Sequence, residues 1–309
     1  MLGDRDRGRP TLDGIGRRRL WPSGPGWYTE DDFRVDPQLG LAVVARGIGA
    51  IGGQGKPASK LAVWSVAGEV GAPESGFRGR DTAQARVQRG ITRAHAAVAR
   101  LSANWPAGLG RPIATMAALL LDGPTAIVAQ IGDCQVIRVR ADGLEKLTTE
   151  HTLANMLPAG SVPPELARVL TRALGRDGEP ELCTIDVRPG DVFLLAASDL
   201  GALSPSELAE VLQRVFARGL DVAAVLDELI RMLTRRTPEG GTATLALVKV
   251  GHGHGRPATG GSAQAPGLRW LFAPGEPLAD PPIEWSAGTS GGPDRRWFAE
   301  VFAGVMGDD

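Results

Sequence analysis

The sequence predicts an α+β sandwich in which mainly antiparallel strands form sheets and helices flank them. Short apolar runs bounded by turn residues, Asp-Gly pairs beside such runs, and segments with helical apolar spacing all favour this fold class. Strands are expected at 41–45, 114–121, 125–131, 135–139, 182–187, 191–197 and 242–250.

Two Asp-Gly pairs predict tight turns between strands. Asp122-Gly123 separates two expected strands, and Asp142-Gly143 follows a third. Tight hairpin turns need residues that tolerate positive φ, and glycine does so without steric cost. Much of the sheet structure is therefore expected to be antiparallel.

The clearest helical pattern runs from Val87 to Leu101, where apolar residues recur at intervals of three and four. This spacing places one apolar stripe on a helix of roughly twenty residues. Shorter helices are expected at 58–66, 164–174, 205–217 and 222–233, with Ser204 as an N-cap.

Composition indicates a globular protein, and one large domain with tails fits its length as well as two domains do. The chain has 309 residues, is 43% hydrophobic, and balances 34 basic against 35 acidic side chains. This charge balance indicates no nucleic-acid partner. The longest apolar run, 113–121, is far shorter than the roughly 20 residues that span a bilayer, and no apolar signal segment is seen. We therefore expect a soluble, cytoplasmic protein with no membrane partner.

Three regions are expected along the chain. Residues 1–25 are rich in arginine, lack an apolar period and are expected to form a flexible tail. Residues 26–250 form the folded domain. In the extension at 251–309, 17 of the first 46 residues are Gly or Pro, which is typical of a linker or a wrapping chain, and its end predicts an amphipathic aromatic helix.

The aromatic residues of this extension need an apolar surface to cover, either on the domain's own flank or on a partner protein. The candidates for partner docking are Trp270, Trp285, Trp297, Phe298 and Phe302.

Several motifs occur in the order seen in one enzyme family. They are Thr29-Glu30-Asp31, the strand ending Ala45-Arg46-Gly47, Gly132-Asp133, Leu147-Thr148-Thr149-Glu150-His151, Pro189-Gly190-Asp191, Ser198-Asp199 and Ala243-Thr244. In this respect residues 27–250 resemble the PP2C (PPM) family of metal-dependent serine/threonine protein phosphatases.

The resemblance implies two antiparallel sheets packed face to face, with helices on both outer sides. It also implies a site in which carboxylates hold two Mg²⁺ or Mn²⁺ ions that activate water for attack on phosphoserine or phosphothreonine. An arginine just before the first motif binds the phosphate in the family.

This sequence departs from the family pattern at the positions that carry the chemistry. Arg46 stands where the family has the carboxylate that bridges both metals, and Gly241 stands where it has a further aspartate ligand. Gly26 replaces the phosphate-binding arginine, and Leu200 replaces a glycine. The remaining relics of the metal site are Glu30, Asp31, Asp133, Asp199 and the backbone of Gly47.

We interpret Arg46 as a substitute for the charge of the metal ions. A guanidinium among Asp31, Asp133 and Asp199 neutralises carboxylates that would otherwise repel one another. No metal cofactor is then expected. Two alternatives stay open: Arg46 points into solvent and one hydrated ion binds, or the carboxylates are kept as turn and cap residues.

The leading hypothesis is a catalytically inactive PP2C-like protein, a pseudophosphatase, with a regulatory or binding role in bacterial signalling. Its expected partner is a phosphorylated or acidic protein segment, held by Arg46, or an assembly partner. The alternatives are a weakly active Mg- or Mn-dependent phosphatase and a structural subunit anchored by residues 270–306. His151 is expected to cap a helix or lie exposed, and Cys134 and Cys183 are both expected to be buried.

Overall fold

The computed structural model describes residues 8–21, 29–49, 53–72, 82–176, 178–197, 199–217, 221–238 and 241–253. The strands are β1 (Gly8–Trp21), β2 (Asp31–Asp36), β3 (Leu41–Ile48), β4 (Ile113–Asp122), β5 (Thr125–Ile131), β6 (Gln135–Arg140), β7 (Gly143–Lys146), β8 (Glu181–Asp186), β9 (Val192–Ala196) and β10 (Gly241–Gly253). The helices are α1 (Lys56–Gly71), α2 (Ala83–Ala103), α3 (Leu153–Met156), α4 (Pro205–Ala217) and α5 (Val222–Arg236), with a short 3-10 helix at Pro164–Leu166.

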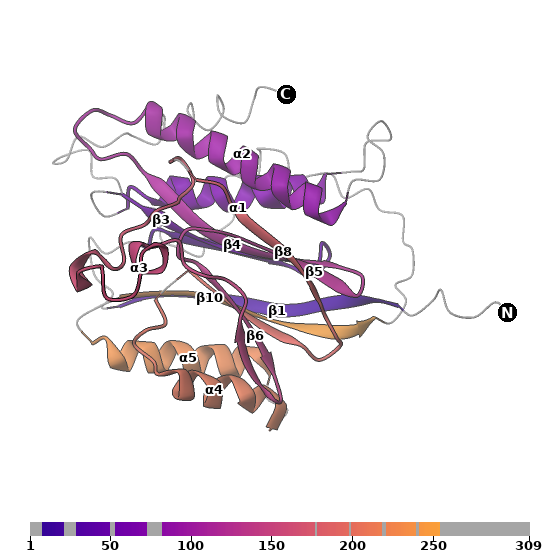
Figure 1. The fold of residues 1–309 in the computed structure, drawn as a ribbon. Helices are drawn as coiled ribbons and strands as arrows, with labels where there is room; N and C mark the ends of the chain where they lie inside the picture. Colours follow the sequence, from indigo (N-terminus) through magenta and orange to yellow (C-terminus); the bar gives the residue numbers. More distant parts are fainter. Residues whose placement is uncertain are drawn as a thin grey trace, which may run out of the picture.

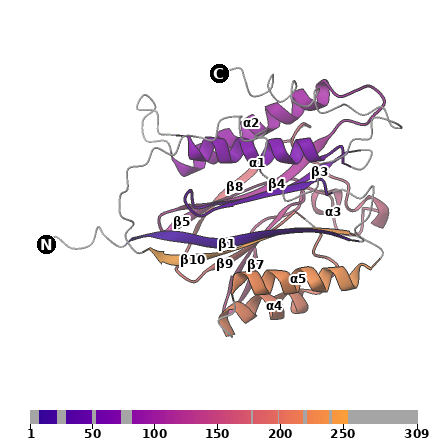
Figure 2. The same ribbon diagram turned by 180° about the vertical axis from the view of Figure 1, so that it is seen from behind.

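The ten strands in the described part of the chain form two five-stranded antiparallel sheets. One sheet has the order β1-β10-β9-β6-β7 and the other the order β2-β3-β4-β5-β8. Figures 1 and 2 show the sheets stacked face to face, with α1 and α2 over one outer face and α4 and α5 over the other. This arrangement confirms the predicted α+β sandwich.

Each of the three interfaces between layers has its own apolar core. Alternate residues of β3 divide between two cores, because side chains of a strand alternate between the faces of its sheet. Val43 packs under α1 and α2, whereas Val44 packs between the sheets with Phe193 of β9. The third core joins the other sheet to α4 and α5.

Both expected hairpins are present. Gly123 has a φ of +60° and joins β4 to β5, in which Asp122 pairs with Thr125. The turn before Gly143 joins β6 to β7, in which Arg140 pairs with Gly143. The helical pattern from Val87 to Leu101 lies in α2, which begins after Thr82, whose side chain accepts a hydrogen bond from the N–H of Ala85.

The flexible tail expected at 1–25 is wrong for residues 8–21, which form the edge strand β1. Its register with β10 runs from Gly8 opposite Gly253 to Trp21 opposite Gly241. Backbone hydrogen bonds hold this strand, so it needs few apolar side chains: Leu12 is buried between the sheets and Ile15 packs toward α4 and α5. The Arg17 side chain is partly exposed, and its Nε lies 3.3 Å from Oδ1 of Asp227 on α5.

The helix expected at 164–174 is also wrong. Only Pro164–Leu166 form a helical turn, and the following segment is tied to the sandwich. Leu174 and Ala114 exchange two backbone hydrogen bonds, of 2.7 and 3.3 Å. These bonds hold the segment in an extended conformation, which is incompatible with a helix. We call residues 152–174, which include α3 and this segment, the flap.

Of the two cysteines, Cys134 is buried as expected and Cys183 is exposed, because it lies on the edge strand β8. No helix among the described residues is long and apolar enough to cross a membrane. The aromatic docking candidates from Trp270 to Phe302 lie outside the described residues, as does Gly26.

Candidate functional site

The relic residues gather at one end of the sandwich. Arg46 lies near the end of β3, where it is opposite Asp31 of β2 and Thr115 of β4 in the strand register. Asp133 follows β5 and Asp199 follows β9. Strand ends from both sheets therefore bring together residues that are far apart in the sequence.

Asp133 is held by a cation and a hydroxyl group. Nη1 of Arg46 lies 3.2 Å from Oδ2 of Asp133, and Oγ1 of Thr115 donates a 2.7 Å hydrogen bond to Oδ1. Both carboxylate oxygens are thus engaged. The Arg46 side chain is 45% exposed, so the predicted ion pair is formed at the surface of the site.

Asp199 binds a second arginine, which the sequence did not indicate. Nη2 of Arg168, in the flap, lies 2.5 Å from Oδ2 of Asp199, and the N–H of Gly201 donates to Oδ1 at 2.8 Å. Burial raises the pKa of Asp199, but the bonds from Arg168 and Gly201, with the charges of Arg168 and Arg46, outweigh it and lower the pKa overall. Arg46 thus acts on Asp199 through its field, while Arg168 makes the contact.

Glu30 is held by backbone groups rather than by a side-chain cation. Its Oε1 accepts a 2.9 Å hydrogen bond from the N–H of Gly55. Burial raises the pKa of Glu30 more than the surrounding backbone N–H groups and Arg46 lower it. This carboxyl group therefore takes up a proton more readily than an exposed glutamate does.

Gly47 is required by close backbone packing. Its N–H donates to the carbonyl oxygen of Glu30 at 3.1 Å, and a Cβ atom here would overlap the carbonyl oxygens of Gly55 and Glu30. This packing gives Gly47 a structural role that needs no metal ion.

A buried lysine adds a further cation that sequence reasoning missed. Nζ of Lys56, at the start of α1, donates to the carbonyl oxygen of Asp31 and lies 3.5 Å from Oδ1 of Asp32. The Asp31 side chain itself is buried. The sequence signal for this residue was its position, because Lys56 directly precedes Pro57 and an apolar helical segment.

Two substituted positions serve the fold. Leu200 is buried in the core beneath α4 and α5, which explains an apolar residue directly after Asp199. Gly241 is the first residue of β10, opposite Trp21, and supplies no carboxylate. Leu200 therefore has a packing role, and Gly241 has no side chain that could bind a metal ion.

His151 is buried, which contradicts its expected exposure. Its Nδ1 accepts a 3.1 Å hydrogen bond from the N–H of Gly132, the residue before Asp133, and its Nε2 lies 3.3 Å from Oε1 of Glu181. Burial lowers the pKa of His151, the charge of Arg172 lowers it further, and Glu181 opposes the shift. The neutral ring thus supports the turn that carries Asp133.

The overall fold matches bacterial phosphatases of known structure. The crystal structure of the serine/threonine phosphatase PstP of Mycobacterium tuberculosis superposes with a TM-score of 0.65 at 23% identity, covering 78% of this chain and 100% of the chain in that structure. The PPM Ser-Thr phosphatase MsPP of Mycobacterium smegmatis gives a TM-score of 0.57 at 24% identity, covering 78% of this chain and 99% of MsPP. The chain has the PP2C (PPM) fold.

Sequence similarity to a protein phosphatase extends over part of the chain. Across 107 residues it is 31% identical to protein phosphatase PhpP of Streptococcus pneumoniae. The match covers 31% of this chain and 44% of PhpP, so it spans less than half the length of that relative. No protein-family model matches the sequence.

The PP2C fold invites a comparison of metal ligands. The catalytic domain of PstP has been solved in complex with two manganese ions, with a TM-score of 0.63 at 24% identity and 78% of this chain covered, against 99% of that domain. Here Asp133 is bound by Arg46 and Thr115, and Asp199 by Arg168. Among the described residues, no group of three or more His, Cys, Asp or Glu is arranged to hold a metal ion. The donor set therefore does not fit a two-metal centre, which relies on a bridging carboxylate.

Proposed function

We propose that this protein is a PP2C-fold binding module that recognises a phosphorylated protein segment and does not hydrolyse it. The observation that supports this most directly is the ion pair between Nη1 of Arg46 and Oδ2 of Asp133. It places a fixed positive charge where the family resemblance requires the carboxylate that bridges two metal ions.

The loss of hydrolysis follows from electrostatics and from the donor count. A divalent ion beside Asp133 must displace the Arg46 guanidinium or bear its repulsion. Gly241 has no side chain to supply a further ligand. Without metal ions to activate water, the carboxylates of this site offer no equivalent nucleophile at neutral pH.

Two arginines supply the chemistry for recognition. Arg46 and Arg168 have side chains that are 45% and 74% exposed, and each pairs with an aspartate at the same end of the sandwich. A guanidinium carries five N–H donors, so an arginine that binds an aspartate keeps donors for a phosphate. Because Asp133 and Asp199 neutralise much of this charge, we expect phosphate binding to need both arginines.

Fluorescence anisotropy with a labelled phosphothreonine peptide in EDTA tests this function. We expect the phosphorylated peptide to bind at least about tenfold more tightly than its unphosphorylated form. Arg46→Ala and Arg168→Ala should each remove most of that preference. Arg231→Ala, on the exposed face of α5, serves as the control and should retain it. Equal binding of the two peptides would contradict the proposal.

A weakly active phosphatase is the second candidate function. It is favoured by the homology to PhpP and by the presence of Asp133, Asp199 and Glu30 at one end of the fold. In this case Mg²⁺ or Mn²⁺ is required, and the chain releases phosphate from a phosphopeptide. Turnover in Mn²⁺ that Asp199→Ala abolishes would establish this function and refute the binding module.

A further inference from the structure

The flap exposes an apolar surface beside the candidate site. Among the described residues, the large apolar side chains with high exposure are Met156 at 68%, Leu166 at 45%, and Leu157 and Val169 at 44% each. All four lie within one stretch of 14 residues, 156–169. Single exposed apolar residues are common on protein surfaces, whereas a concentration of them in one segment is a feature of interaction sites.

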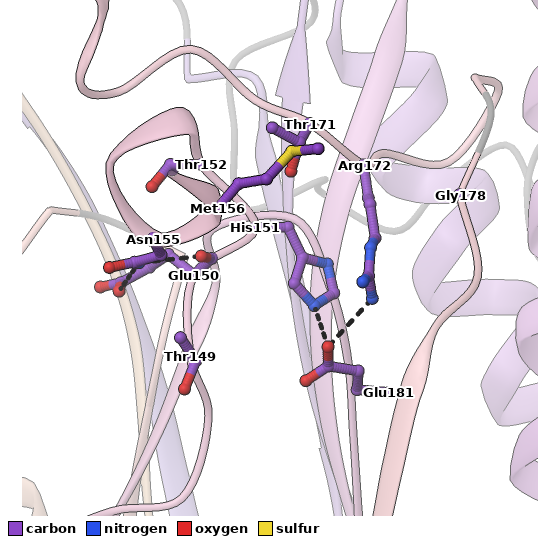
Figure 3. Close-up of a pocket in the computed structure, with 10 residues that line it drawn as sticks. All are labelled: Thr149, Glu150, His151, Thr152, Asn155, Met156, Thr171, Arg172, Gly178 and Glu181. Carbon is purple, nitrogen blue, oxygen red and sulfur yellow. Dashed lines mark hydrogen bonds and ion pairs between the residues drawn. The ribbon is translucent and has the colours of Figure 1, made fainter. Parts of the chain in front are cut away.

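A cavity of about 350 Å³ lies beside Met156, the most exposed of these four residues. Figure 3 shows Met156 above the ring of His151, with Arg172 along one side and Glu181 below them. The cavity is lined by Thr149, Glu150, His151, Thr152, Asn155, Met156, Thr171, Arg172, Gly178 and Glu181. Its volume is sufficient for a large apolar side chain.

The charged groups of this cavity are paired with one another. Oε1 of Glu181 lies 2.9 Å from Nη1 of Arg172 and 3.3 Å from Nε2 of His151. Glu150 is bound by Lys146 at 2.6 Å and by the side chain of Asn155. An apolar group that enters the cavity therefore separates no charge from its partner, whereas an additional ion would have to compete with these pairs.

The cavity and the candidate site share two structural elements. In the flap, Arg168 lies between Leu166 and Val169 in sequence, and its guanidinium binds Asp199. In addition, Nδ1 of His151, which lines the cavity, accepts a hydrogen bond from the N–H of Gly132, the residue before Asp133. The flap thus carries both Met156 of the cavity and Arg168 of the candidate site, and His151 links the cavity to the turn that carries Asp133.

We propose that this cavity receives a bulky apolar side chain, such as leucine, from the same phosphorylated segment whose phosphate binds Arg46 and Arg168. This inference rests on the proposed function and names its partner class: a protein segment with an apolar residue a few positions from the phosphorylated residue. The exposed cations favour an anionic group, and the adjoining cavity, with its charges already paired, favours an apolar one.

A peptide panel tests the inference with the full chain. Phosphothreonine peptides with an Ala/Ser background carry one leucine, scanned through the five positions on each side of the phosphothreonine, and each has an unphosphorylated counterpart. We expect leucine at one or two positions to tighten binding about tenfold, as burial of most of one apolar side chain would give. Met156→Ser should remove this gain and leave the all-alanine phosphopeptide unaffected.

The control variant is Met232→Ser on α5, far from the flap in sequence, which should keep the leucine gain. Because Met156 is largely exposed, its replacement should leave the fold intact, as circular dichroism can verify. A phosphate preference with no effect of leucine at any position would overturn this inference and leave the proposed function in place. A leucine gain that persists in Met156→Ser would also overturn it. Equal binding of each phosphorylated peptide and its unphosphorylated counterpart would refute the proposed function.

Discussion

Nη1 of Arg46 lies 3.2 Å from Oδ2 of Asp133, although 87 residues separate them in the sequence. The pair joins the end of β3 to the turn after β5. Thr115, which is opposite Arg46 in the register with β4, binds the other oxygen of Asp133. Strand register therefore sets the geometry in which a guanidinium neutralises a carboxylate that the fold places at this end.

Restoring carboxylates should restore metal binding. In the double variant Arg46→Asp, Gly241→Asp, the repelling cation is gone and the two carboxylates that the family resemblance implies at these positions are restored. We expect this variant to bind Mn²⁺ with a dissociation constant in the micromolar to millimolar range, measured by calorimetry. Arg231→Asp, at an exposed position on α5, makes the same change of charge as Arg46→Asp and should not bind Mn²⁺. Failure of the folded double variant to bind Mn²⁺ would show that the site lost more than these two ligands.

Acid stability should depend on Asp191, which forms two bonds with Arg140. The distances to Nε and Nη2 of Arg140 are 2.7 and 2.8 Å, and Asp191 is buried. Burial raises the pKa of Asp191, but the bonds from Arg140 and from the N–H of Arg188, with the charges of Arg140 and Arg138, lower it overall. A folded-state pKa below the unfolded value adds stability above the ordinary pKa near 4, and this stability is lost as the pH falls below it.

Asp191→Asn should therefore lower the free energy of unfolding at pH 7 by about 2 kcal/mol or more and flatten its fall between about pH 5 and pH 2. Urea unfolding at a series of pH values measures both effects. Asp142→Asn, in the exposed turn between β6 and β7, is the matched control and should follow the wild type. Parallel curves for Asp191→Asn and wild type would refute the role of this pair.

His151→Leu should destabilise the turn that carries Asp133. Leucine fills the space of the buried imidazole but cannot accept the hydrogen bond from the N–H of Gly132. An unsatisfied buried N–H costs about 1–3 kcal/mol. Chemical denaturation measures the loss. His95→Leu, on the partly exposed face of α2, should stay within about 0.5 kcal/mol of wild type. Equal stability of the two variants would show that His151 does not support the turn.

Two glycine substitutions should have opposite effects. Gly47→Ala places a Cβ against the carbonyl oxygens of Gly55 and Glu30, so we expect a loss of about 3 kcal/mol or more. Gly68→Ala, in α1 with no atom near its Cβ position, should stabilise the helix by about 0.5–1 kcal/mol. Thermal denaturation distinguishes them. A stable Gly47→Ala variant would mean that this backbone contact relaxes easily.

Patterns local in the sequence predicted the elements that depend on local interactions. The apolar stripe from Val87 to Leu101 and the turns at Gly123 and Gly143 correspond to observed structure, because spacing and positive φ are properties of short segments. The edge strand β1 was missed because its pairing with β10 depends on backbone bonds across more than 200 residues. The helix expected at 164–174 was wrong because Leu174 exchanges backbone hydrogen bonds with Ala114, which lies 60 residues away in the sequence.

Only part of the candidate site could be predicted, because motifs identify residues but not their long-range partners. The family motifs identified Arg46, Asp133 and Asp199, and the ion pair of Arg46 with Asp133 is present. The motifs contain neither Arg168 nor Lys56, so they carried no information on these two residues. Long-range partners of this kind follow from the fold and cannot be found from spacing along the chain.

Calorimetric titration of Mn²⁺ into the full-length wild-type chain at pH 7 tests most directly whether Arg46 has replaced the metal centre. We expect no binding up to millimolar Mn²⁺ and an unchanged melting temperature. Saturable binding of two manganese ions per chain, lost in Asp133→Asn and Asp199→Asn, would contradict this interpretation of the site.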